Sequence, residues 1–267
     1  MRILVTNDDG IDSVGLHVLA RRLRPLGQVV IAAPDREYSG ASAALGTLHL
    51  IRPEVRAVHV DGVDSAWSVT GPPALCVMFS RLGVFGGSFD VVVAGINPGA
   101  NAGRAIYHSG TVGAALTARN GGVSGVAISQ AVDDFGVEGQ GWDEMLSDQH
   151  WDTAAAVGAR VVAAVLERPP ARPVVINVNV PNCPEDRILG WRRAQVAHLP
   201  PRALASAELL PKVGHDGAFD VRMDWGDPIP SPAETDSGGV GAGYVTLTAL
   251  SRLVDDTGID LTHLAGG

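Results

Sequence analysis

The chain begins with a short apolar run that stops at a polar turn. Ile3-Leu4-Val5 is followed almost at once by Asn7-Asp8-Asp9-Gly10. A β-branched run that ends in a tight polar turn is typical of a buried parallel strand. In open α/β sheets, ligands bind beyond the carboxyl ends of such strands. The sequence therefore predicts two adjacent carboxylates at a ligand-binding edge.

Two neighbouring carboxylates repel each other and also repel an anionic substrate. A divalent cation held by oxygen ligands would neutralise both. The competing interpretation is that Asp8 and Asp9 only shape the turn and cap the following helix. These four residues alone leave both interpretations open.

Strand and helix patterns alternate along the first 180 residues. This alternation predicts an α/β fold, a doubly wound and mostly parallel sheet. The strands are expected at 29–33, 89–94, 126–128 and 174–180, with extra strands at 48–60 and 66–69. The helices are expected from about residue 16 to 26, then at 72–82, 111–120 and 151–167. The acidic stretch 132–149 is expected to be a surface loop.

The remaining residues, 181–267, differ in composition. They are rich in Gly, Pro and Asp and contain only short strand patterns, such as 244–248. We therefore divide the chain into a domain at 1–180 and a C-terminal extension at 181–267 used for assembly. The extension must bury Trp191, Val245 and Leu247, and a partner subunit is the expected cover.

Composition narrows the class of protein. The formal net charge of −9 argues against general binding of duplex nucleic acid, which demands basic surfaces. No apolar run approaches the roughly 20 residues that span a bilayer. Met1-Arg2-Ile3 leads straight into a strand, and Cys76 and Cys183 suggest no disulfide framework. We expect a cytoplasmic enzyme that does not contact the membrane.

Three polar loops follow three predicted strands and should emerge at one edge of the sheet. The first carries Asp8 and Asp9, the second Ser39, and the third Asn97. Carboxylate, hydroxyl and amide oxygens suit Mg²⁺, Mn²⁺ or Ca²⁺ rather than zinc. Taken singly, Ser39 and Asn97 are more typical of ordinary turn or cap residues.

Ser109-Gly110-Thr111 precedes the helix expected at 111–120. A helix amino-terminus with small residues presents free N–H groups to an anion, although a plain Ser or Thr cap is commoner. An anion cradle beside a cation site suits phosphoryl transfer to water. His108 is either a general acid for the leaving group or a hydrogen-bonded loop histidine.

Two other chemistries fit the sequence less well. A dinucleotide site needs G-x-G-x-x-G after the first strand, where this chain has N-D-D-G. An aspartyl-phosphate mechanism through Asp8 or Asp9 stays open, but such phosphatases usually add a downstream lysine. The only lysine here is Lys212, which is poorly placed in the extension.

The ordered set of motifs resembles the SurE (survival protein E) family of metal-dependent 5′/3′-nucleotidases. The resemblance covers nearly the whole chain, and the set is far more specific than any one motif. The matching segments are I-L-V-T-N-D-D-G at 3–10, A-P-D-R at 33–36, S-G-A-S at 39–42, G-I-N-P-G-A-N-A-G at 95–103, S-G-T-V at 109–112, N-V-N-V-P at 177–181, T-D at 235–236 and G-Y-V-T-L-T at 243–248.

The resemblance implies a Rossmann-like domain whose C-terminal part exchanges elements between subunits of a homodimer or homotetramer. It also implies one divalent metal ion per subunit, Mg or Mn, and a nucleoside monophosphate or similar phosphate ester as substrate. Its metal ligands match Asp8, Asp9, Ser39 and Asn97. Its phosphate-side residues match Asn101, Ser109, Gly110 and Thr111. We expect Asp8, Asp9, Asn97 and His108 to carry the catalysis.

The chain also departs from the family pattern, although it keeps all four metal ligands. The departures are Tyr38, Pro72, Leu75, Ala105, His108 and Thr117. These substitutions should affect the preferred substrate and the catalytic rate more than the class of reaction. The leading hypothesis is a metal-dependent phosphatase for nucleoside monophosphates. The alternatives are a phosphatase for another small phosphate ester and a non-catalytic nucleotide-binding protein of the same fold.

Overall fold

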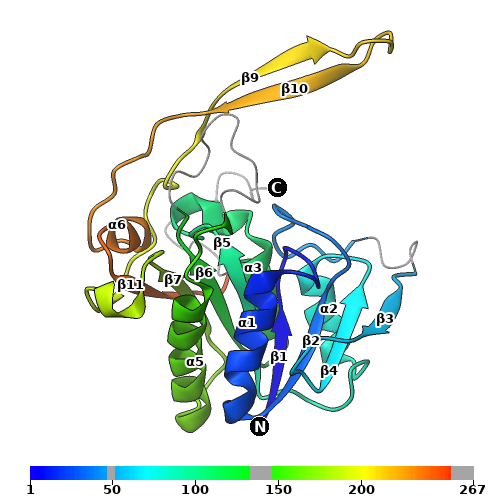
Figure 1. Cartoon of the computed structure of the whole chain (residues 1–267), viewed down its shortest axis with the longest axis vertical. Coiled ribbons are helices and arrows are strands. Elements are labelled where there is room, and N and C mark those ends of the chain that lie inside the picture. The colour runs from blue at the N-terminus through cyan, green and yellow to red at the C-terminus, as the bar shows by residue number, and fades with distance from the viewer. Residues whose placement is uncertain (47–51, 133–145, 254–267) are drawn as a thin grey trace, which may run out of the picture.

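The computed structural model describes residues 1–46, 52–132 and 146–253. Within those ranges, nine strands form one sheet in the order β3-β4-β2-β1-β5-β6-β7-β11-β8 (Figure 1). The six strands from β4 to β7 run parallel, and β3 and β11 pair antiparallel to their neighbours β4 and β7. The prediction of an α/β, mostly parallel sheet is confirmed.

The element bounds follow the predicted alternation closely. The strands of this sheet are β1 Arg2–Thr6, β2 Gln28–Pro34, β3 Val55–Val58, β4 Ser65–Val69, β5 Val91–Pro98, β6 Ser124–Gln130, β7 Val175–Val180, β8 Trp191–Arg193 and β11 Val245–Leu250. The α-helices are α1 Val14–Leu23, α2 Pro73–Arg81, α3 Gly110–Asn120, α5 Trp151–Glu167 and α6 Asp236–Gly241. Short 3₁₀ turns are η1 Arg24–Leu26, η2 Gly103–Tyr107 and η3 Glu185–Arg187. Most of the loop predicted at 132–149 lies outside the described residues.

Alternating side chains of the central strand β1 reach the two faces of the sheet. Ile3 and Val5 join the core beneath α1 and α5, whereas Leu4 joins the core beneath α2 and α3. All three side chains are completely buried. Figure 1 shows α1 and α5 side by side in front of the sheet, and their packing covers that face. A strand that is covered on both faces has apolar residues at consecutive positions. Residues 3–5 are apolar for this reason.

The parallel pairing brings the loops after β1, β2 and β5 to one edge of the sheet. β1 lies between β2 and β5, with Leu4 opposite Val30 on one side and Val92 on the other. The carboxyl ends of these three strands are therefore neighbours. These are the loops in which the sequence places Asp8, Ser39 and Asn97.

Part of the C-terminal segment completes the main sheet. β11 pairs antiparallel with β7 and parallel with β8. Val245 is fully buried in the core of its own subunit, and Leu247 packs against that core. For Val245 the expectation that a partner subunit provides the cover was wrong, because pairing with β7 places this side chain in the subunit's own core. For the partly buried Leu247 and for Trp191 it stays a prediction. Trp191 stays 40% exposed. The division of the chain at residue 180 stays a prediction.

A second part of this segment leaves the body of the molecule. β9 Leu204–Pro211 and β10 Phe219–Trp225 form a separate antiparallel ribbon. Figure 1 shows this ribbon reaching well away from the sheet and helices. At its base, the Gly226 N–H donates to the Ala203 carbonyl at 2.9 Å. We refer to residues 204–225 as the ribbon.

None of the helices in the described ranges combines the length and the apolar character needed to cross a membrane.

We expect Val245→Ala to lower the free energy of unfolding by about 2 kcal/mol, because it removes two methyl groups from a filled core. Urea denaturation monitored by circular dichroism measures this loss. Val213→Ala is the matched control, since Val213 is 97% exposed. Equal midpoints for the two variants would show that the C-terminal strand does not belong to the subunit's own core.

Candidate functional site

Asp8 lies at the carboxyl end of β1 and is almost completely buried. Its Oδ2 accepts a hydrogen bond from the Gly110 N–H at 3.1 Å, and its Oδ1 accepts one from the Thr111 hydroxyl at 2.5 Å. Burial raises the pKa of Asp8, and the Thr111 hydrogen bond opposes that rise. The start of α3 thus holds this carboxylate.

The contact between Asp8 and α3 is tight enough to require glycine at position 110. A Cβ atom there would lie 2.8 Å from both Cβ and Oδ2 of Asp8. Any side chain at 110 therefore displaces the carboxylate or the helix. The sequence predicted that the Gly110 N–H helps to bind a phosphate. In the structure this N–H donates to the Asp8 carboxylate instead.

Asn97 comes from the end of β5, where the pairing with β6 shifts register between Ala94 and Asn97. Its Nδ2 donates to the Gly99 carbonyl at 2.7 Å, which fixes the amide orientation. Its Oδ1 lies 3.4 Å from the Thr111 hydroxyl. Because Thr111 also contacts Asp8, one hydroxyl joins the first and third polar loops.

Asp9 differs from Asp8 because its Oδ2 is buried and has no hydrogen-bond partner. Desolvation raises the pKa of Asp9 well above its usual value, and the negative charges of Asp8 and Glu37 raise it further. Glu37 was not singled out in the sequence, because it belongs to a loop whose course was not predicted. A buried, unpaired carboxylate oxygen beside a second carboxylate favours a cation.

Ser39 sits on the second loop and is exposed, with its hydroxyl donating to Glu37 Oε1 at 2.7 Å. The Tyr38 N–H donates to the Asp8 carbonyl at 2.7 Å, so this loop lies against the first one. Further along, the Ser42 N–H donates to the His108 carbonyl at 3.2 Å. The second loop therefore spans the site from Asp8 to the residue just before Ser109.

The remaining predicted residues occupy different positions. Ser109 is buried and caps α3 by accepting the Val112 N–H at 3.0 Å. His108 is exposed beside it. Asn101 is buried and donates its side-chain amide to Ser129 Oγ at 2.9 Å. Asn101 thus takes part in a buried polar cluster rather than in the group around Asp8.

The donors around Asp8 are all oxygen atoms. Across the described residues, no three His, Cys, Asp or Glu side chains gather closely enough to hold a metal ion. A cation here would therefore combine the two carboxylates with neutral donors such as the Asn97 amide oxygen. This donor chemistry fits Mg²⁺ or Mn²⁺, which prefer hard oxygen ligands and keep several waters. The buried Asp9 Oδ2, which has no hydrogen-bond partner, also favours a cation at this position.

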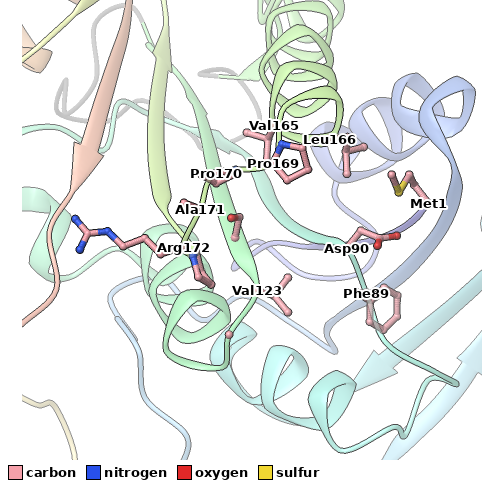
Figure 2. Close-up of a pocket in the computed structure, with 13 residues that line it drawn as sticks. Met1, Phe89, Asp90, Val123, Val165, Leu166, Pro169, Pro170, Ala171 and Arg172 are labelled. Atoms are coloured by element: carbon pink, nitrogen blue, oxygen red, sulfur yellow. The ribbon is translucent and has the colours of Figure 1, made fainter.

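One hollow of about 310 Å³ lies elsewhere, beside the amino-terminal ends of β1, β5, β6 and β7. Figure 2 shows Phe89, Asp90, Val123 and Pro169 around it. None of the candidate site residues lines this hollow. Ligands of open α/β sheets bind at the carboxyl ends, so we place the functional site at Asp8.

Comparisons with known proteins give a consistent result. A family model described as Survival protein SurE matches residues 3–201. The 5'-nucleotidase SurE of Mannheimia succiniciproducens is 35% identical over 254 residues, covering 94% of this chain and 92% of that protein. The 5'/3'-nucleotidase SurE of Erwinia tasmaniensis is 34% identical, covering 94% and 90%. The crystal structure of the SurE protein from Aquifex aeolicus matches with a TM-score of 0.71 and 26% identity, covering 94% of this chain and 93% of that one.

Asp9→Asn should stabilise the protein in the absence of divalent metal. The pKa of Asp9 is raised in the folded state, so the unfolded chain loses this proton first as the pH rises. Folded stability therefore falls as pH increases above the ordinary aspartate pKa of 3.8. The variant should unfold at a higher temperature than the wild type at pH 7 in EDTA, and the difference should shrink toward pH 4.

Asp12→Asn is the control for this measurement, because Asp12 is a nearby exposed aspartate and the change removes the same charge. Differential scanning calorimetry of both variants across that pH range checks the prediction. If Asp9→Asn were no more stable than Asp12→Asn at pH 7, the buried Asp9 charge would not destabilise the metal-free fold, and the prediction would be wrong.

Proposed function

Because the chain belongs to the SurE family, we propose that it is a divalent-metal-dependent phosphatase that hydrolyses nucleoside monophosphates to nucleoside and phosphate. The observation that carries this proposal is the Asp8–Asp9 pair, with one carboxylate fixed by α3 and the other left with a free buried oxygen. The two relatives named above are nucleotidases, which supports a 5'-nucleotidase activity.

We assign the metal to Asp8, Asp9, Asn97 and Ser39. A divalent cation supplies positive charge to a phosphate oxygen and lowers the pKa of a neighbouring water. Asp8 cannot turn away from this position, because Gly110 and Thr111 hold both of its oxygens. The backbone contact between Tyr38 and Asp8 brings the loop of Ser39 against the first loop, and Ser39 would exchange its bond to Glu37 for the cation.

We assign the phosphate to the amino-terminal end of α3, with Ser109, Gly110 and Thr111 as its nearest residues. The helix dipole stabilises an anion there, whereas the Gly110 and Val112 N–H groups already bond to Asp8 and Ser109. Asn101 contributes by fixing the loop that leads to this helix. To His108, which is exposed next to Ser109, we assign the protonation of the leaving oxygen of the nucleoside.

The location of the protein is a further proposal. Cys76 is buried and carries a free thiol. Free thiols are typical of a reducing compartment, which fits the predicted cytoplasmic location.

The activity is tested by measuring phosphate release from a panel of nucleoside monophosphates and simple phosphate esters, with Mg²⁺, Mn²⁺ and EDTA compared. We expect release that needs the metal and is fastest for the nucleotides. Asp8→Asn should lower kcat by roughly 100-fold or more. Asp12→Asn, at an exposed neighbouring aspartate, should leave it unchanged.

Each alternative has its own result in this panel. Faster turnover of a non-nucleotide ester would identify the protein as a phosphatase for another small ester. Nucleotide binding without turnover would identify a non-catalytic binding protein. Full activity of wild type and Asp8→Asn in EDTA would contradict the metal-dependent mechanism.

We also propose that the ribbon joins subunits of a homodimer or homotetramer. Phe219, Val221, Met223 and Trp225 alternate along β10 on one face, and each is about half exposed. A lone two-stranded ribbon with an open apolar face is marginally stable in water. A second copy of this chain would cover that face, in line with the exchange of elements implied by the family resemblance.

Replacing Val221 and Met223 together by aspartate should dissociate the assembly, because it puts two charges into an apolar interface. Arg222→Asp is the control, since it changes the net charge by the same −2 but acts on the other face of β10, where Arg222 pairs with Glu208. Light scattering should give at least a dimer for wild type and control, and a smaller mass for the double variant. A wild-type monomer with full activity would rule out the assembly role.

A further inference from the structure

Asp236 is a fully buried carboxylate that interacts with backbone amides from three parts of the chain. Its Oδ1 accepts the Ala197 N–H at 2.9 Å and the Ser237 N–H at 2.8 Å. Both oxygens accept the Gly103 N–H, at 3.2 Å and 3.1 Å. Four such hydrogen bonds to one carboxylate are far more than capping the short helix α6 requires.

Gly103 is held on its other side by the segment that precedes the ribbon. Its φ is +55°, and a Cβ atom there would lie 2.0 Å from the Leu199 carbonyl oxygen. The Gly103 backbone is therefore enclosed between residues 197–199 and Asp236. Only glycine combines this left-handed conformation with so close an approach.

The residue two positions earlier is held equally firmly. The Asn101 carbonyl accepts the side-chain amides of Asn177 at 2.7 Å and Asn179 at 3.1 Å, both from β7. All three side chains are buried. The loop after β5 is thus fixed at 101 by strand β7 and at 103 by Asp236.

Backbone hydrogen bonds between residues three positions apart lead from this loop to the proposed active site. Ala105, His108 and Ser109 donate to the carbonyls of Ala102, Ala105 and Ile106, respectively. The tight turn η2 is followed by His108 and then by Ser109, which caps α3. The next two residues are Gly110 and Thr111, which hold Asp8.

We propose that Asp236 is a positioning residue that sets the placement of α3 against Asp8 through Gly103 and η2. The inference rests on the proposed phosphatase function and extends it to the C-terminal segment, which contributes none of the assigned ligands. In this proposal the C-terminal segment supports the active site through Asp236 and also completes the sheet through β11. Misplacement of catalytic groups by about 1 Å costs up to 100-fold in rate, so a loosened η2 affects turnover directly.

Asp236→Asn tests the proposal with the smallest change in shape. An amide that keeps its oxygen at the Oδ1 position still accepts from Ala197 and Ser237. Its NH₂ group then replaces Oδ2, so the Gly103 N–H keeps only the Oδ1 contact at 3.2 Å and faces a second donor. We expect kcat for metal-dependent phosphate release to fall roughly 10- to 100-fold.

Thr235→Ala is the matched control in the same segment. The Thr235 hydroxyl caps α6 by accepting the Gly238 N–H at 3.1 Å, and it donates to the Pro232 carbonyl at 2.6 Å. Neither bond reaches the loop after β5. This variant should lose thermal stability comparable to that lost by Asp236→Asn, yet keep wild-type kcat.

Hydrogen exchange measured by mass spectrometry gives a second readout that is independent of activity. In Asp236→Asn, the amides of 102–111 should exchange faster than in wild type. In Thr235→Ala, the increase should be confined to 236–242.

Equal kcat losses in the two variants, or unchanged exchange at 102–111 in Asp236→Asn, would overturn the positioning role. Failure of the proposed function would look different, because the wild type itself would release no phosphate with Mg²⁺ or Mn²⁺. In that case the exchange result still decides whether Asp236 fixes the loop.

Discussion

The site depends on a difference in hydrogen bonding between two adjacent carboxylates, Asp8 and Asp9. Asp8 has both oxygens bound by the start of α3, whereas Asp9 keeps a buried oxygen with no partner. A protein that needed only a turn at the end of β1 would gain nothing from this arrangement, because desolvation and mutual repulsion both work against it. The arrangement becomes favourable when a cation occupies the space beside Asp9, so the cost to the metal-free fold supports a metal-binding function.

Close backbone approach explains why α3 is built from small residues. Gly110 faces Asp8, and a Cβ atom at Gly113 would lie 2.1 Å from the Ser42 carbonyl oxygen. One face of the helix is thus packed against the first two polar loops, while its preceding turn is tied to Asp236. Helix α3 has a weak apolar periodicity for this reason. Its position is set by backbone contacts and buried hydrogen bonds more than by large apolar side chains.

The sequence predicted the sheet because apolar runs and helical spacing are local patterns that survive folding unchanged. The common edge for Asp8, Ser39 and Asn97 followed from strand direction alone. The role of Asp236 could not be predicted, since a buried carboxylate bound to backbone amides 39 and 133 residues away has no periodic signature. Val245 was misjudged for a related reason: composition does not reveal that a late strand pairs with β7.

The C-terminal segment has two physically separate tasks. Its α6 and β11 pack within the subunit and bear on the active-site loop through Asp236, whereas the ribbon leaves the body at a closed base between Ala203 and Gly226. Both chain segments that join the ribbon to the body contact Gly103, because residues 197–199 enclose it and Asp236 accepts its N–H. Because both segments contact Gly103, the proposed assembly through the ribbon would affect the placement of α3 through residues 197–199 and through Asp236.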